Sequence, residues 1–143
     1  MLADVLLVLH LLGAVIWVGG MFFALAVLRP SLAAVPAEYR LDLHLQVLRR
    51  FFLVIWHAMP VMLGTGFSML YVVYGGFAGA QWNVHVMLLL GLIMSAIFVG
   101  VFFGPWRHLR RTRSPALVDR IRRLIQVNLV LGLIVVIVAA LNY

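Results

Sequence analysis

Three histidines lie inside long apolar stretches of the chain and are its best candidates for chemistry. His10, His57 and His85 each stand among aliphatic residues, whereas His44 and His108 stand beside arginines. A neutral imidazole has one donor and one acceptor nitrogen, and inside a bilayer both need partners. Such histidines normally face the interior of a helix bundle. We therefore expect His10, His57 and His85 to bind a metal or cofactor, and a hydrogen bond between helices is the alternative for each.

The stretch HLLGAVIWVGG, residues 10–20, predicts how the first of these histidines is presented. Helical spacing puts four residues on one face: His10, Ala14, Trp17 and Met21. Gly13 and Gly20 lie beside that face, where small residues allow another helix or a flat ligand to approach the backbone. We expect His10, Trp17, Gly13 and Gly20 to line a cofactor pocket.

Two other apolar stretches show comparable stripes of polar and small residues. The stripe in the second stretch consists of His57, Val61, Gly64 and Ser68, with Pro60 beside it. The stripe in the last stretch consists of Asn128, Gly132 and Ala139. A proline inside a membrane helix opens the backbone locally. We expect both stripes to face the interior of the bundle.

The composition indicates an integral membrane protein. The chain has 143 residues, of which 66% are hydrophobic and 10% charged, and its mean hydropathy is +1.15. A membrane helix needs about 20 apolar residues. We predict an all-α four-helix bundle, a single four-span membrane domain over residues 1–143. The predicted spans are 4–28, 51–74, 83–105 and 120–142, with an amphipathic cytoplasmic segment at 36–50.

Proline and serine residues predict where the helices begin and end. The Arg29-Pro30 pair is expected to end the first span, and Pro105 with Trp106 the third. Ser114 and Pro115 are typical of an N-cap followed by a first helical residue, and therefore predict the start of the last helix.

The distribution of arginine predicts orientation. All eleven basic residues are arginines, four in the first connection between spans and seven in the third. The positive-inside rule then places both termini and the 75–82 turn on the outer side of the membrane. Clustered arginines in such a protein anchor anionic lipid, so we expect the lipid bilayer as partner and no nucleic acid.

Depth in the membrane suggests which histidines share a ligand. His10 and His85 both fall near the outer surface, whereas His57 lies nearer the arginines. Two imidazoles at one depth match the axial ligands of a b-type haem in a bundle core. We therefore expect a haem b-binding electron-transfer protein, a membrane oxidoreductase exchanging electrons with quinone or another redox partner. His57 would bind a second haem or handle protons.

Copper is the alternative metal. Imidazole and thioether both suit copper ions, and the sequence places His85 near Met87, and His57 near Met59 and Met62. Met87 lies about 200° around a helix from His85, so those two do not form one site. The chain has no cysteine, which excludes thiolate sites. It also lacks phosphate-binding loops and hydrolase motifs, which excludes kinases and hydrolases.

Three sequence motifs resemble known families. The stretches HLLGAVIWVGG, RRFFLVIWHAMPVMLGTGFSMLY and RRLIQVNLVLGLIVVIVAAL resemble the copper resistance protein D (CopD) family of membrane domains. That resemblance spans all four predicted helices and implies copper uptake or export across the inner membrane, with Asn128 at the family's acidic fourth-span position.

A more distant resemblance is to the HemJ-type protoporphyrinogen oxidases. It rests on His10 and Trp17 in the first span and on Trp82 and His85 in the third. It implies a bound b-type haem and a role in haem biosynthesis. The small-residue faces leave one further alternative, a membrane scaffold or homo-oligomer without a cofactor.

Overall fold

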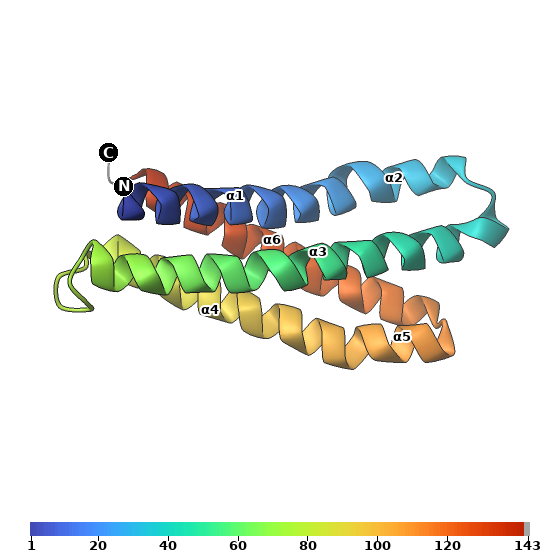
Figure 1. The fold of residues 1–143 in the computed structure, drawn as a ribbon. Coiled ribbons are helices and arrows are strands. Elements are labelled where there is room, and N and C mark those ends of the chain that lie inside the picture. Colours follow the sequence, from blue (N-terminus) through green and yellow to red (C-terminus); the bar gives the residue numbers. More distant parts are fainter. Residues whose placement is uncertain (142–143) are drawn as a thin grey trace.

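Long helices make up almost all of the chain. The computed structural model describes residues 1–141 (Figure 1). Four helical segments are long and apolar enough to cross a membrane: Leu2–Ala34, Ala37–Val72, Trp82–Thr112 and Pro115–Ala140. The predicted all-α membrane fold with four spans is confirmed.

The first and third segments are each composed of several helical types. The first consists of α1 (Leu2–Phe22), a π-helix η1 (Phe23–Leu28), α2 (Arg29–Ser31) and a 3₁₀ turn η2 (Leu32–Ala34). The third consists of α4 (Trp82–Val101), a π-helix η3 (Phe102–Trp106) and α5 (Arg107–Thr112). The other two are single helices, α3 (Ala37–Val72) and α6 (Pro115–Ala140).

Neither Pro30 nor Pro105 ends its helix, which corrects two of the predicted boundaries. Pro30 follows the π-helix η1, in which the Arg29 N–H bonds to the Ala24 carbonyl five residues back, and Pro105 lies within the π-helix η3. A π-turn is wider than an α-turn, so it accommodates a proline that lacks an N–H and crowds the carbonyl four residues earlier. The helices continue to Ala34 and Thr112. Ser114 and Pro115 begin α6 as predicted.

The amphipathic segment at 36–50 is the first part of α3 and not a separate helix. Pro36 is its N-cap, and the guanidinium of Arg40 closes the turn before it by donating to the carbonyls of Val35 (2.8 Å) and Ala33 (3.1 Å). At 1.5 Å per residue the 36 residues of α3 extend roughly 54 Å, whereas the hydrocarbon core is about 30 Å thick. The N-terminal part of α3 therefore extends beyond the hydrocarbon.

All the arginines lie toward one end of the bundle. The N-terminus, the α3–α4 loop and the end of α6 lie together, and the turns before α3 and α6 lie at the opposite, basic end (Figure 1). An ion pair between Arg113 and Asp42 joins the two basic turns. Which end faces the cytoplasm stays a prediction from the positive-inside rule.

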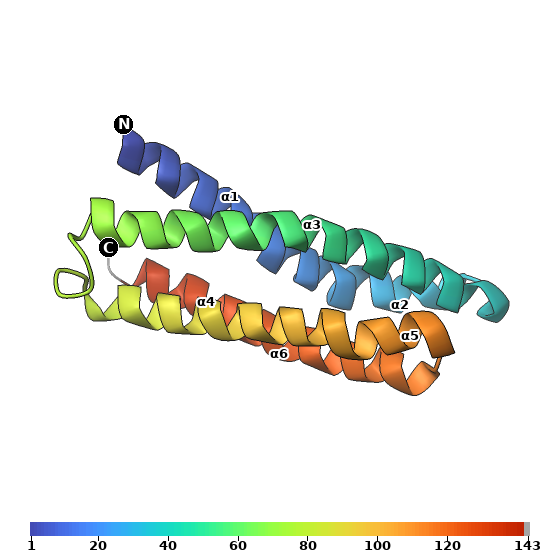
Figure 2. The same ribbon diagram turned by 60° about the horizontal axis from the view of Figure 1, so that its bottom comes forward.

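Two helix pairs build the bundle. α1 packs mainly on α3, and α4 mainly on α6. Figure 2 shows α1 crossing α3 at an angle, while α4 and α6 run side by side. The pairs meet in an aromatic core, where Phe52 contacts Phe98, Phe102 and Trp106 at ring-centroid distances of 5.0–5.9 Å. Trp17 reaches Phe98 edge-on at 6.3 Å.

Two of the three predicted interior stripes face the interior. In α1 Gly13, Trp17 and Met21 are buried, and in α6 Asn128 and Gly132 are buried. The stripe predicted for α3 is wrong, because all its members are exposed: His57, Val61, Gly64 and Ser68. The buried face of α3 carries larger residues instead: Leu48, Phe52, Ile55, Ala58, Met59, Thr65 and Leu70.

A glycine notch determines how closely α1 and α3 approach. A Cβ atom placed on Gly13 would collide with Cγ of Met62, and would lie 3.5 Å from the Ala58 carbonyl oxygen. A Cβ placed on Gly19 would meet no atom within 4 Å. Of these two glycines, only Gly13 is required for the packing of α1 against α3.

We predict that Gly13→Ala destabilises the protein by about 1–3 kcal/mol, because the α1–α3 pair must move apart to admit the methyl group. Gly19→Ala is the matched control and should not lower stability, because a methyl group there meets no atom and alanine favours the helix. Unfolding of both variants in one detergent, followed by helical circular dichroism, measures the difference. Equal unfolding midpoints for the two variants would show that the notch does not hold the helices together.

Candidate functional site

His10 joins α1 to α3 through its ring. Nδ1 lies 3.0 Å from the backbone oxygen of Met62 and 3.1 Å from Oγ1 of Thr65. The imidazole is partly buried, and Thr65 is 7% exposed. His10 therefore lies at the interface of the helix pair, on the face predicted for it.

The hydrogen-bond partners determine the tautomer of His10. The Met62 carbonyl can only accept, so Nδ1 must carry the proton. The hydroxyl of Thr65 donates to the Val61 carbonyl at 2.6 Å. Its oxygen therefore keeps a lone pair, which can accept a hydrogen bond from the same Nδ1–H of His10. Nε2 of the neutral ring then keeps its lone pair. Histidines that bind metals typically donate their other ring N–H to a carbonyl in this way.

Small and sulfur-containing residues surround this imidazole. Gly66 leaves room for the ring, because a Cβ there would lie 3.3 Å from Cε1 of His10. The side chain of Met62 occupies the notch at Gly13, one turn along α1 from His10, with Sδ 3.5 Å from the position of a Cβ on that glycine. An imidazole and a thioether thus occur in one short stretch of the α1–α3 interface. Both are ligand types that copper ions accept.

His57 and His85 lie on outer faces of the bundle, which differs from the expected interior positions. Nδ1 of His57 is 2.8 Å from the Leu53 carbonyl of its own helix, and the side chain is exposed. The exposed ring of His85 stacks on Phe77 of the α3–α4 loop, at 6.2 Å between centroids and 10° between planes. The structure therefore brings neither of them into the interface that holds His10.

The facing pair of imidazoles expected for haem b is not formed, since His10 contacts α3 and His85 stacks on the loop. Within residues 1–141 no three histidine or carboxylate side chains gather where they could hold a metal ion. His57 and Met59 also lie on different faces of α3, because Met59 is buried. Of the copper pairings considered from sequence, Met62 remains near a histidine, and that histidine is His10.

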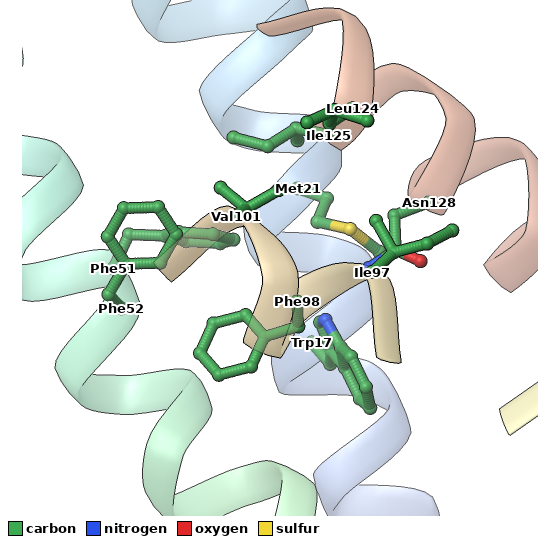
Figure 3. Close-up of a pocket in the computed structure, with 10 residues that line it drawn as sticks. All are labelled: Trp17, Met21, Phe51, Phe52, Ile97, Phe98, Val101, Leu124, Ile125 and Asn128. Atoms are coloured by element: carbon green, nitrogen blue, oxygen red, sulfur yellow. The ribbon is translucent and has the colours of Figure 1, made fainter. Parts of the chain in front are cut away.

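Trp17 and Gly20 have packing roles in this arrangement. Trp17 is 2% exposed and lies in the aromatic core, while a Cβ on Gly20 would lie 3.4 Å from the Phe51 ring. Trp17 and Asn128 line one small pocket (Figure 3), with a volume of about 10 Å³. Nε1 of Trp17 and Oδ1 of Asn128 have no protein partner, and the space suits about one water molecule. The Asn128 amide donates to the Met94 carbonyl at 3.2 Å.

Thr65 and the backbone of Met62 are the site residues that sequence reasoning missed. The signal was present in the large residues of α3, because Phe52, Ile55, Met59 and Met62 recur every three or four positions. That spacing extends to Thr65 and identifies the buried face. The stripe of small and polar residues chosen instead is on the opposite side of the helix.

Comparison with known protein families gives a match over most of the chain. The family model for copper resistance protein D matches residues 45–142, which is more than two thirds of the chain and includes most of α3 together with α4 and α6. No curated protein and no solved structure matches the chain. The match includes two of the three motifs that carry the resemblance, at residues 49–71 and 122–141, and begins after the first, at residues 10–20. The chain therefore belongs to the copper resistance protein D family of membrane proteins.

Proposed function

We propose that this protein binds copper inside its helix bundle and carries it across the bacterial inner membrane. The observation that carries the proposal is the hydrogen bond from His10 Nδ1–H to the Met62 carbonyl, which leaves Nε2 unprotonated and able to bind a metal ion. Family membership supports copper as the cargo. Haem b, the main expectation from sequence, lacks support from the comparisons and from the positions of the histidines.

The available ligands favour the reduced ion, Cu(I). Cu(I) is a soft ion that accepts thioether and imidazole ligands, and the chain has no cysteine. Met62 lies next to His10 across the interface, and the thioethers of Met21, Met59 and Met94 follow in the core of the bundle. Copper entering beside His10 would therefore meet thioether ligands on its way inward. These methionines also fill the core, so their ligand role is part of the proposal.

The positions of the arginines predict how the bundle is oriented in the membrane. With the basic end in the cytoplasm, His10 lies toward the outer surface, in the half of the bundle that holds the termini. Copper would then reach His10 from the periplasmic side. The arginines at the opposite end would repel a free cation, so an acceptor on the cytoplasmic side would have to take the ion within the bundle or beside it.

Substitution of His10 tests the proposal directly. We predict that His10→Ala lowers the affinity of the purified protein for Cu(I) at least tenfold, because a first ligand is lost. Met62→Leu should weaken binding while preserving the packing against Gly13. His57→Ala and His85→Ala are the matched controls and should bind as the unaltered protein does. Competition with a coloured Cu(I) chelator under reducing conditions measures the Cu(I) affinity of the unaltered protein and of the four variants.

The visible spectrum of the same samples separates copper from haem. The copper proposal expects a protein without haem bands before or after dithionite. A Soret band that sharpens on reduction, or equal Cu(I) affinity in His10→Ala and the control variants, would contradict the proposal.

The hydrogen bond to Thr65 gives a further prediction about the tautomer. Thr65→Val should destabilise the protein by about 0.5–1.5 kcal/mol and broaden the His10 imidazole resonances, whereas Thr65→Ser should preserve both. Nitrogen-15 NMR of the labelled ring reports the protonation of each nitrogen. A protonated Nε2 in the unaltered neutral protein would contradict the geometry described for His10.

A further inference from the structure

A groove runs along the outside of the bundle between α1–η1 and α3, separate from the His10 interface. Its volume is about 390 Å³, within the usual range for small-molecule sites. The residues from the first segment that line it are Ile16, Gly20, Phe23, Ala24 and Leu28. The residues from α3 that line it are His44, Val47, Leu48, Arg50, Phe51, Val54 and Ile55.

The long dimension of this groove lies along the helices and its wall is mostly apolar. Ile16 and Leu28 bound it on the first segment, a separation of roughly 18 Å at 1.5 Å per residue. The π-helix η1 forms one wall, and such π segments are frequent at functional sites. An extended hydrocarbon chain is the ligand shape that such a groove admits.

Arginine side chains lie along the half of the groove nearer the basic end. Arg50 lies about midway along the groove, and the partly buried His44 lines its basic end, where the charge of Arg29 acts on the His44 ring. No carboxylate lines the groove. In the part of the chain that the structure describes, Asp42 is paired with Arg113, and neither Arg29 nor Arg50 is in an ion pair.

We propose that this groove binds one anionic phospholipid. One acyl chain occupies the apolar wall, and the phosphate lies between Arg50 and the basic end of the groove, where His44 lines it and Arg29 is close to His44. Basic pockets between membrane helices on the cytoplasmic side commonly hold such headgroups. A second copy of this chain fits less well, because it would bring a second set of arginines to the same end. A quinone fits less well because its neutral head does not use the positive charge.

Native mass spectrometry of the delipidated full-length protein tests the proposal. The probes are phosphatidylglycerol and phosphatidylcholine with identical acyl chains, each titrated in a neutral detergent. We expect phosphatidylglycerol to bind more tightly. Arg50→Gln should raise its dissociation constant about fivefold, since one arginine near the membrane surface contributes about that factor. Arg49→Gln is the matched control, because Arg49 is exposed and does not line the groove.

A second pair of variants tests the apolar part of the groove without changing charge. Ala24→Phe fills the groove and should weaken phosphatidylglycerol binding, whereas Ala26→Phe changes an exposed position that does not line it and should not. Equal affinity for the two lipids, or equal losses in Arg49→Gln and Arg50→Gln, would overturn the proposal. So would displacement of the lipid by inorganic phosphate alone or by a quinone.

Discussion

The lack of water in the hydrocarbon core is the constraint on which the rest of this structure depends. Every backbone N–H and carbonyl must be satisfied within the protein, which is why helices make up the spans. The hydroxyls of Thr65 and Ser95 bond to carbonyls four residues back in their own helices, and so does the His57 ring. Within residues 1–141, side-chain hydrogen bonds between different spanning helices involve His10 and Asn128. Each holds one of the two helix pairs together.

Similar contacts hold the two helix pairs together. In α1–α3, His10 bonds to the carbonyl of Met62, and the side chain of that methionine fills the notch at Gly13. In α4–α6, Asn128 bonds to the carbonyl of Met94, and the Cε atom of that methionine would lie 3.2 Å from a Cβ on Gly132. In each pair, therefore, a polar side chain bonds to the carbonyl of a methionine on the partner helix, and that methionine also lies against a glycine three or four residues further on. Gly132 has a second role, because a Cβ there would lie 2.9 Å from Val18 of α1, so this glycine also allows α1 to approach α6.

Helix number and the faces of α1 and α6 could be predicted from sequence, because apolar length and small-residue spacing act locally. The face of α3 could not be predicted by the same rule. His57, Gly64 and Ser68 also form a small, polar stripe, yet it faces outward because the bulky residues from Phe52 to Met62 fill the bundle core. Burial of large side chains decided the rotation of this helix. The partner of His10 could not be predicted either, because it is a backbone carbonyl, and residue types do not reveal which carbonyl lies opposite.

The helix boundaries at Pro30 and Pro105 were wrong for a related reason. Proline predicts the end of an α-helix, but a π-turn near it absorbs the missing hydrogen bond, and both π-turns lie toward the basic end. The two π-helices have different surroundings. Pro105 and Trp106 are buried and extend the core, whereas η1 lines the outer groove that Arg50 also lines. The same local irregularity thus lies in the packed core of one helix pair and along an outer groove of the other. The histidine interface and this groove lie in different halves of the α1–α3 pair, because His10 contacts Met62 and Thr65, whereas the groove extends from Ile16 to Leu28 on the first segment.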